Sequence, residues 1–267
     1  MTADDPGELR DLATRLARAA GTLALEGRRS VGTGTRVAHD TKSTATDPVT
    51  EFDRAAEELL VGELTRSRPD DAIVGEEGTS RPGTSGLEWH LDPIDGTVNF
   101  VYDLPLWSTS VGVVDERGPM AGAVYAPAIG EMFAAARGGG ATLDGEPLAA
   151  SETTDLSTSL VATGFNYDPA VRHGQGIAMA EMLTRIRDVR RLGSAALDLC
   201  FVAAGRYDAY FEEHLNSWDI AAGLLIATEA GATASDYTGA RARPSQVVVA
   251  APGIHTELLA IIAESTR

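Results

Sequence analysis

Apolar residues recur at helical spacing in two segments of the first quarter of the chain. Residues 6–27 place leucine and alanine on one stripe, and residues 48–66 repeat the pattern;. The second segment follows Asp47-Pro48, and proline is favoured in the first turn of a helix. The pattern therefore predicts two amphipathic helices joined by a polar loop at 39–47.

Runs with β-type patterning come next. Short apolar runs at 71–75 and 87–91 end in acidic residues and predict two strands;. From 108 to 150 four further apolar runs are separated by turn pairs such as Asp144-Gly145;. This region is predicted to be an antiparallel meander.

Strands and helices alternate after residue 160. The predicted strands are 160–165, 188–192, 209–213 and 247–251;. The predicted helices are 172–187, one from Ser194, 217–230 and one from 254;. We expect an α+β part at 1–150 and an α/β part at 151–267 that together form one compact unit.

Composition and charge limit the class of protein. A hydrophobic content of 43% and a charged content of 23% are ordinary for a soluble globular chain;. The polar, acidic N-terminus lacks the apolar segment of a signal peptide, and no apolar run reaches the roughly 20 residues that span a bilayer;. We expect a cytoplasmic protein. A formal net charge of −17 argues against binding to nucleic acid or to an anionic membrane;.

The choice of metal ligands is also narrow. Cys200 is the only cysteine, and the five histidines show no metal-binding spacing;. Carboxylates remain, and oxygen ligands suit Mg²⁺, Mn²⁺ or Ca²⁺.

One acidic motif stands at residues 91–97, Leu-Asp-Pro-Ile-Asp-Gly-Thr. Pro93 is expected to fix a bend after the strand, so that Asp92 and Asp95 aim at a common point. Gly96 would let the backbone approach an anion closely, and Thr97 would begin a helix whose free N–H groups face phosphate.

Two further acidic positions complete the pattern, Glu76-Glu77 after a strand and Asp219 at a helix start. Taken singly, Glu76-Glu77 is more typical of a solvated turn, and Asp219 is more typical of a first-turn acid that complements the helix dipole. If they converge, their mutual repulsion requires cations, and two divalent ions form the clamp used in phosphate ester hydrolysis.

The chain resembles a known family in three segments. "GEE" at 75–77, "WHLDPIDGTVNF" at 89–100 and the segment 190–232 are similar to the inositol monophosphatase family of Mg²⁺-dependent, lithium-sensitive phosphatases. The resemblance implies a layered αβαβα sandwich, usually a homodimer. It also implies a small phosphate monoester as substrate and two or three Mg²⁺ ions, with Mn²⁺ as an alternative.

The resemblance also implies roles for individual residues. The metal ligands would be Glu76, Asp92, Asp95, Asp219 and the carbonyl oxygen of Ile94. The catalytic residues would be Thr97, paired with Asp47 to activate water, and Glu76. The substrate contacts would be Ile94, Asp95, Gly96, Thr97, Gly193, Ser194, Ala195, Glu212 and Asp219. Glu212 matches the acid that binds inositol hydroxyls, and Glu213 beside it is the alternative position.

The expected reaction is hydrolysis of inositol 1-phosphate to myo-inositol and phosphate, by attack of water assisted by Mg²⁺. Histidinol phosphate, fructose 1,6-bisphosphate and 3′-phosphoadenosine nucleotides are alternative substrates of the same fold. A haloacid dehalogenase-like phosphatase, with Asp92 as nucleophile, would need a motif one residue shorter;. A non-catalytic binding or regulatory relative is the alternative from another class.

Overall fold

The computed structural model describes residues 5–42 and 46–265. Its first sheet has the strand order β10-β9-β8-β7-β6-β5-β3-β4 and is antiparallel except where β3 pairs with β5. The strands are β3 (Ala72–Gly75), β4 (Ser80–Arg81), β5 (Glu88–Asp95), β6 (Ser108–Asp115), β7 (Gly118–Ala126), β8 (Glu131–Ala136), β9 (Gly140–Leu143) and β10 (Glu146–Pro147). The predicted meander is confirmed in β6 to β10.

The second sheet has the order β12-β11-β13-β15-β14. Its first three strands are parallel, and β15 pairs antiparallel with both β13 and β14. The strands are β11 (Leu160–Thr163), β12 (Asp188–Arg190), β13 (Ala209–Glu213), β14 (Thr233–Ser235) and β15 (Gln246–Ala250). A small antiparallel pair, β1 (Asp40–Thr41) with β2 (Pro48–Val49), lies outside both sheets.

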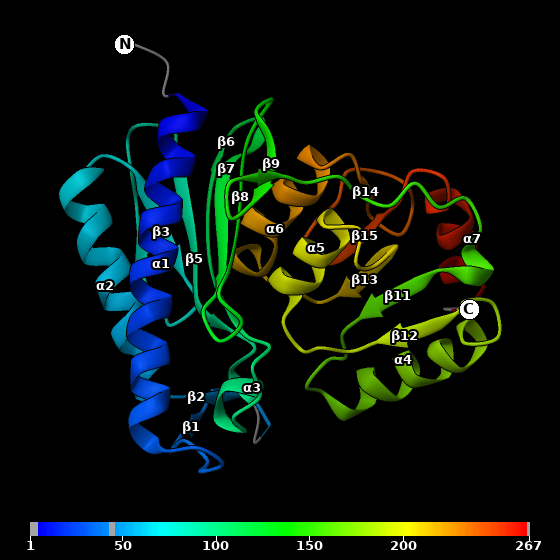
Figure 1. The fold of residues 1–267 in the computed structure, drawn as a ribbon, viewed down its shortest axis with the longest axis horizontal. Helices are drawn as coiled ribbons and strands as arrows, with labels where there is room; N and C mark the ends of the chain where they lie inside the picture. Colours follow the sequence, from blue (N-terminus) through cyan, green and yellow to red (C-terminus); the bar gives the residue numbers. More distant parts are fainter. Residues whose placement is uncertain (1–4, 43–45, 266–267) are drawn as a thin grey trace.

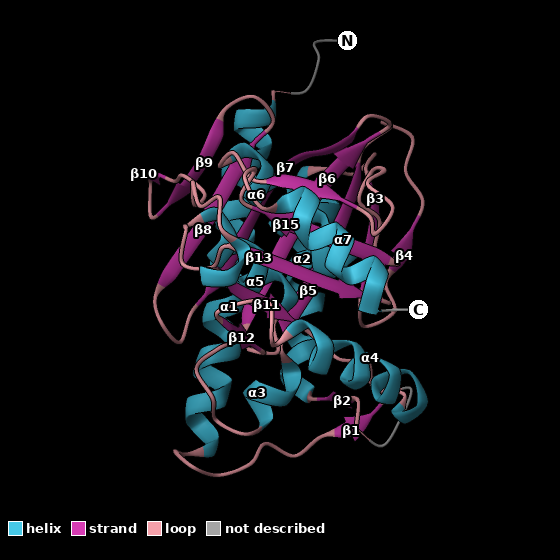
Figure 2. Ribbon diagram, turned by 90° about the vertical axis from the view of Figure 1, so that its right-hand side faces the viewer, coloured by secondary structure: helices cyan, strands magenta, loops and turns pink. Residues whose placement is uncertain are grey.

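Helices separate and cover the two sheets. They are α1 (Pro6–Val31), α2 (Glu51–Ser67), α3 (Thr97–Val101), α4 (Pro169–Met182), α5 (Ala195–Ala203), α6 (Ser217–Glu229) and α7 (His255–Ser265), with a 3₁₀ turn at Leu156–Thr158. In Figure 1, α1 and α2 cover the outer face of the first sheet, and α5 and α6 lie between the sheets. Figure 2 shows α4 and α7 in front of the second sheet. The predicted αβαβα sandwich is confirmed.

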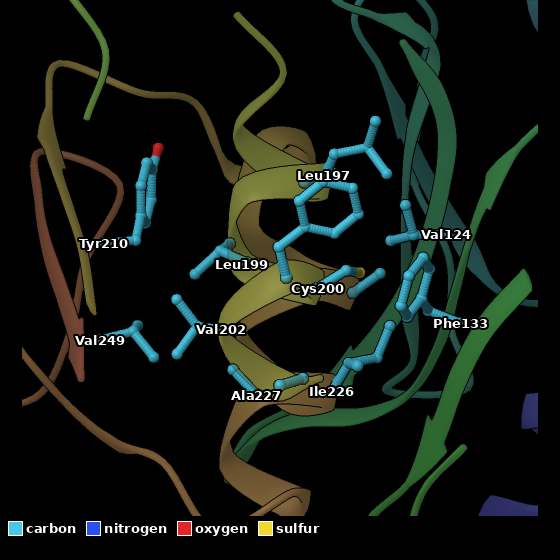
Figure 3. Close-up of a cluster of buried hydrophobic side chains, with 14 of the residues drawn as sticks. Val124, Phe133, Leu197, Leu199, Cys200, Val202, Tyr210, Ile226, Ala227 and Val249 are labelled. Atoms are coloured by element: carbon cyan, nitrogen blue, oxygen red, sulfur yellow. The ribbon is translucent and has the colours of Figure 1, made fainter. Parts of the chain in front are cut away.

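Alternating residues of the second sheet supply two separate cores. On β11 and β13, Ala162 and Tyr210 pack toward α5 and α6, whereas Val161 and Ala209 pack toward α4 and α7;. Figure 3 shows α5 between the sheets, with Leu199 on the side of Tyr210 and the second sheet. Burial on both sides fixes this helix, and its N-terminus is a part of the site described below.

Several predicted boundaries were wrong. The second helix does not begin at Asp47-Pro48, because Thr50 caps it: the Thr50 hydroxyl accepts from the Asp53 N–H at 3.4 Å, and Asp53 accepts from the Thr50 N–H at 2.8 Å;. The helix predicted at 172–187 is α4, which begins earlier, after Asp168 accepts from the Ala170 N–H;. The division of the chain near residue 150 stays a prediction. In the described residues, no helix has the length and apolar character to cross a membrane.

Candidate active site

Residues 91–95 of the motif lie within β5 rather than in a bend after it. The pairing of β5 with β6 runs regularly to Asp92 and resumes at Asp95, so the register shifts between the two aspartates. An irregularity of this kind re-aims side chains and is common beside active sites. The predicted bend at Pro93 is therefore a bulge in a strand, and the Pro93 carbonyl accepts from the Thr109 hydroxyl at 2.8 Å.

Asp95 is held by the N-terminus of α5. Its Oδ2 accepts from the Ser194 hydroxyl at 2.6 Å and from the Ala196 N–H at 2.7 Å, and its Oδ1 accepts from the Ala195 N–H at 3.3 Å. Burial raises the pKa of Asp95 to about 6, although these donors act to lower it;. This contact joins a strand of the first sheet to a segment about 100 residues later in the chain.

Asp92, Asp95 and Asp219 form one acidic cluster. Each offers a carboxylate oxygen within 4.8 Å of the others. Asp219 lies in the first turn of α6, where its Oδ2 accepts from the Asn216 N–H at 2.6 Å. The predicted convergence of the Asp92–Asp95 motif with Asp219 is thus present in the structure.

Glu76 lies beside this cluster and is bound by a lysine. The Lys42 Nζ lies 2.9 Å from Glu76 Oε1 and 2.5 Å from Glu77 Oε1. Burial lowers the pKa of Lys42, but the two carboxylates outweigh it, so the net change is upward. Here Lys42 supplies one of the positive charges that this end of the site needs.

The acidic cluster fits a divalent cation. Burial raises the pKa of Asp92 well above its usual range, and the carboxylates of Glu76, Asp95 and Asp219 raise it further;. Asp92 Oδ1 and Glu76 Oε2 are buried without a hydrogen-bond partner among the described residues. Buried oxygen atoms of this kind, from carboxylates that repel one another, are the donor set that Mg²⁺ or Mn²⁺ prefers.

The turn after β5 adopts the predicted form. Gly96 has φ +96°, and a Cβ there would lie 3.0 Å from the Gly193 carbonyl oxygen, so both conformation and space favour glycine;. Thr97 begins α3. Its Oγ1 is 3.1 Å from the Ile94 carbonyl oxygen and 3.3 Å from Asp53 Oδ1.

Asp53 is a site residue that the sequence analysis did not name. Its carboxylate both caps α2 and reaches Thr97, and burial raises its pKa to about 6. In sequence it looks like a capping-box acid, which hides its second contact. The pairing of Thr97 with Asp47 stays a prediction, and Asp47 lines the same cavity.

The segment before α5 and the end of β13 form the other side of the site. Asn99 of α3 donates to the Leu192 carbonyl at 2.7 Å, which fixes the approach to Gly193. On β13, Glu212 Oε2 accepts from the Tyr210 hydroxyl at 2.7 Å. Burial raises the pKa of Glu212 to about 7, while Tyr210 and Arg191 act to lower it.

One cavity of about 520 Å³ unites the two sides. It is lined by every predicted site residue: Asp47, Glu76, Asp92, Ile94, Asp95, Gly96, Thr97, Gly193, Ser194, Ala195, Glu212 and Asp219. Glu213 lines it as well, and it accepts from the Gln175 amide at 3.2 Å. Among the described lining residues, the carboxylates far outnumber the lysine and arginine side chains, which are Lys42 and Arg191. An anionic substrate therefore needs added positive charge here.

Comparison with known proteins agrees with this geometry. The family model described as "Inositol monophosphatase family" matches residues 5–267. "Inositol-1-monophosphatase SuhB" of Mycobacterium tuberculosis is 44% identical, over 97% of this chain and 94% of that protein. "Nus factor SuhB" of Pasteurella multocida is 38% identical, over 93% of each chain.

A solved structure shares the fold at full length. "Mycobacterium tuberculosis SuhB" superposes with a TM-score of 0.84 at 42% identity and covers 98% of each chain. This match excludes the haloacid dehalogenase-like alternative. The match along the whole sequence, the shared fold and the acidic cavity agree, and the chain belongs to the inositol monophosphatase family.

Proposed function

We propose that this phosphatase hydrolyses inositol 1-phosphate to myo-inositol and phosphate and that the reaction depends on Mg²⁺. The observation that carries the proposal is the presence of Glu212 in the same cavity as the acidic cluster of Asp92, Asp95 and Asp219. One end of the cavity suits a metal-assisted phosphate reaction, and the other offers a carboxylate to the hydroxyls of an alcohol.

The metal would be held at the acidic end. Its ligands would be carboxylates of Glu76, Asp92, Asp95 and Asp219 and the carbonyl oxygen of Ile94. When bound, Mg²⁺ supplies the positive charge that phosphate oxygens require and polarises water for attack on phosphorus. The Gly96–Thr97 turn would bind the phosphate, because Gly96 has no side chain to block an anion and Thr97 begins α3, whose first N–H groups have no partner within the helix;.

Thr97 would position the attacking water. Its Oγ1 lies within hydrogen-bond distance of Asp53, so the hydroxyl proton can point to Asp53 Oδ1 and leave a lone pair to accept from water;. Asp53, with a pKa of about 6, is largely ionised at neutral pH and is able to take up a proton;. Asp47 is the alternative acid for this role.

Glu212 would bind hydroxyls of the leaving alcohol. The Tyr210 hydroxyl fixes one carboxylate oxygen at 2.7 Å and leaves the other available. Gly193 to Ala195 form the facing wall, whose backbone is fixed by the contacts of α5 with Asp95.

Phosphate release from four esters, with Mg²⁺ and with EDTA, tests the proposal. The panel is inositol 1-phosphate, histidinol phosphate, fructose 1,6-bisphosphate and 3′-phosphoadenosine 5′-phosphate. We expect Mg²⁺-dependent release that is fastest for inositol 1-phosphate. A strong preference for another ester would refute the substrate assignment, and turnover that persists in EDTA would refute the metal dependence. Mn²⁺ and Li⁺ added to the same assay test replacement of Mg²⁺ and lithium sensitivity.

A binding or regulatory role is the second candidate. It is favoured by relatives that carry the name "Nus factor SuhB", among them the one at 38% identity. No turnover on any of the four esters, in protein shown to be folded, would favour this role over catalysis.

We also propose that the chain forms a homodimer. Exposed apolar side chains support this proposal: Leu104 is 50% exposed, Ile177 57% and Leu183 46%;. Light scattering coupled to size-exclusion chromatography should give about twice the chain mass of 28.0 kDa; a monomer at micromolar concentration would refute the proposal.

A further inference from the structure

A second carboxyl group lies at the alcohol end of the cavity, on α5. Asp198 is the one charged residue in this helix, whose sequence is otherwise apolar. Its side chain is buried, with the residue 1% exposed, and it lines the same cavity as Glu212.

The helical repeat explains how an apolar helix presents one acid to the cavity. Asp198 stands three residues after Ala195, so the two share a face of α5, and both line the cavity;. Leu197 and Leu199 instead pack into the core between the sheets, as Figure 3 shows. Asp198 is therefore placed where α5 leaves the core and meets the site.

The hydrogen bonds of Asp198 are incomplete. Its Oδ1 is buried and has no hydrogen-bond partner among the described residues. A buried polar atom without a partner costs free energy, and such atoms in native proteins usually meet a ligand or water. An acid in the first turn also complements the helix dipole, but that role does not require burial: Glu257 in the first turn of α7 is exposed;.

The surroundings of Asp198 complement those of Glu212. Burial raises the pKa of Asp198 well above its usual range, and the Glu212 carboxylate raises it further, whereas Arg191 opposes the change. A protonated carboxyl group donates one hydrogen bond and accepts others. The free oxygen of Glu212 accepts, since its other oxygen is already bound to Tyr210.

We propose that Asp198 is a further alcohol-binding residue, whose carboxyl group acts together with that of Glu212 to bind neighbouring hydroxyls of a polyol phosphate. The inference rests on the proposed phosphatase function and narrows its substrate class. It distinguishes a polyol phosphate from an ester whose leaving group carries no further hydroxyl, because only a polyol satisfies both carboxyl groups at once. A site with buried hydrogen-bonding groups rejects an analogue that leaves them unpaired.

The test compares two esters in the full-length protein with Mg²⁺: inositol 1-phosphate and p-nitrophenyl phosphate, which has no hydroxyl. Asp198→Leu removes the hydrogen-bonding atoms but keeps the branched shape of the side chain, and Asp198→Asn keeps a donor and an acceptor. We expect Asp198→Leu to lower kcat/KM for inositol 1-phosphate roughly 10–100-fold more than for p-nitrophenyl phosphate. Asp198→Asn should restore most of the selectivity, and Glu257→Leu controls for removal of a first-turn acid outside the site.

The outcomes separate the two proposals. Equal losses on both esters would show that Asp198 only supports the fold, and would overturn this inference while the phosphatase function stood. Loss of selectivity in Asp198→Asn as large as in Asp198→Leu would also overturn it, because hydrogen bonding would then not be the cause. No turnover of either ester by the unmodified protein would overturn the proposed function and this inference with it.

Discussion

The two ends of the cavity differ in how their carboxylates are supported. At the metal end, Asp95 accepts three hydrogen bonds from Ser194, Ala195 and Ala196, and Asp219 accepts one from the Asn216 N–H. At the alcohol end, Glu212 has one such donor, Tyr210, and Asp198 Oδ1 has none among the described residues. The difference indicates that Asp95 is fixed before any ligand binds, whereas Asp92 Oδ1 and Glu76 Oε2, which have no hydrogen-bond partner among the described residues, are left for a cation. The acids at the alcohol end leave hydrogen-bonding capacity for the substrate.

The largest effect should come from the metal end. Asp92→Asn removes one charge from the cluster, and we expect kcat/KM to fall at least ~100-fold on every ester, because the proposed metal would serve all of them. In EDTA the same variant should melt at an unchanged or higher temperature, since one of several repelling buried carboxylates is gone;. Phosphate release checks the predicted loss of activity, and thermal melting checks the predicted stability. A lower melting temperature of the variant in EDTA would mean that Asp92 mainly stabilises the fold.

The next effect should come from the water-positioning pair. Thr97→Val keeps the shape but removes the hydroxyl, and kcat should fall roughly 10–100-fold on all esters with little change in KM. Thr97→Ser is the matched control and should keep most of the activity.

Separate Asp53→Asn and Asp47→Asn variants decide which acid serves Thr97. The observed 3.3 Å contact predicts that Asp53→Asn, combined with Thr97→Val, lowers kcat no further than Thr97→Val alone;. If only Asp47→Asn shows this non-additivity, the pairing implied by the resemblance is the functional one.

Much of the metal end was predictable from sequence, because Asp92, Asp95, Gly96 and Thr97 stand together in one short motif. The strand that carries them was predicted to end too early. Proline and two acids argue locally against a strand, yet β6 pairs with β5 across the bulge up to Asp95;. Pairing with a strand that lies later in the chain is not visible in local propensity.

The alcohol end was less predictable, because its residues come from distant segments. Gly193 and Glu212 were identified only through resemblance to the family. Asp53 and Asp198 were missed, since an acid in the first turn of a helix is ordinarily read as a cap or a dipole partner. Only the packed structure shows that Asp198 in the first turn of α5 lines the cavity and that Asp53 in the first turn of α2 contacts Thr97.

A glycine provides a selective way to disturb the alcohol end. A Cβ at Gly164 would lie 2.0 Å from Glu212 Oε2, so Gly164→Ala must displace that carboxylate. We expect kcat/KM for inositol 1-phosphate to fall about 10-fold, with a smaller change for p-nitrophenyl phosphate. Gly174→Ala is the matched control, because a Cβ there meets nothing within 4 Å. Equal activity of the two variants on inositol 1-phosphate would show that Glu212 does not contribute to substrate binding.

The smallest effect is a pH dependence of stability that belongs to the alcohol end. The pKa of Glu212 rises from its usual 4.5 to about 7 on folding, so the folded state binds a proton more tightly than the unfolded state. Stability from this group is therefore present below pH 4.5 and is lost as the pH rises toward 7. In EDTA, the melting temperature of Glu212→Gln relative to the unmodified protein should rise by about 3–6 °C between pH 5 and pH 7.5.

Asp115→Asn is the control for this measurement. Folding lowers the pKa of Asp115 instead of raising it, so its removal should give no such trend with pH. Hydrogen bonds from Arg137 hold the pKa of Asp115 well below its usual range, so that carboxyl group is ionised in both states above pH 5. Its removal should lower the melting temperature by the same amount at both pH values. A parallel, pH-independent difference for Glu212→Gln would show that Glu212 is already ionised and solvated in the folded protein. In that case the contrast between the two ends would disappear, because Glu212 would be as fully supported as Asp95.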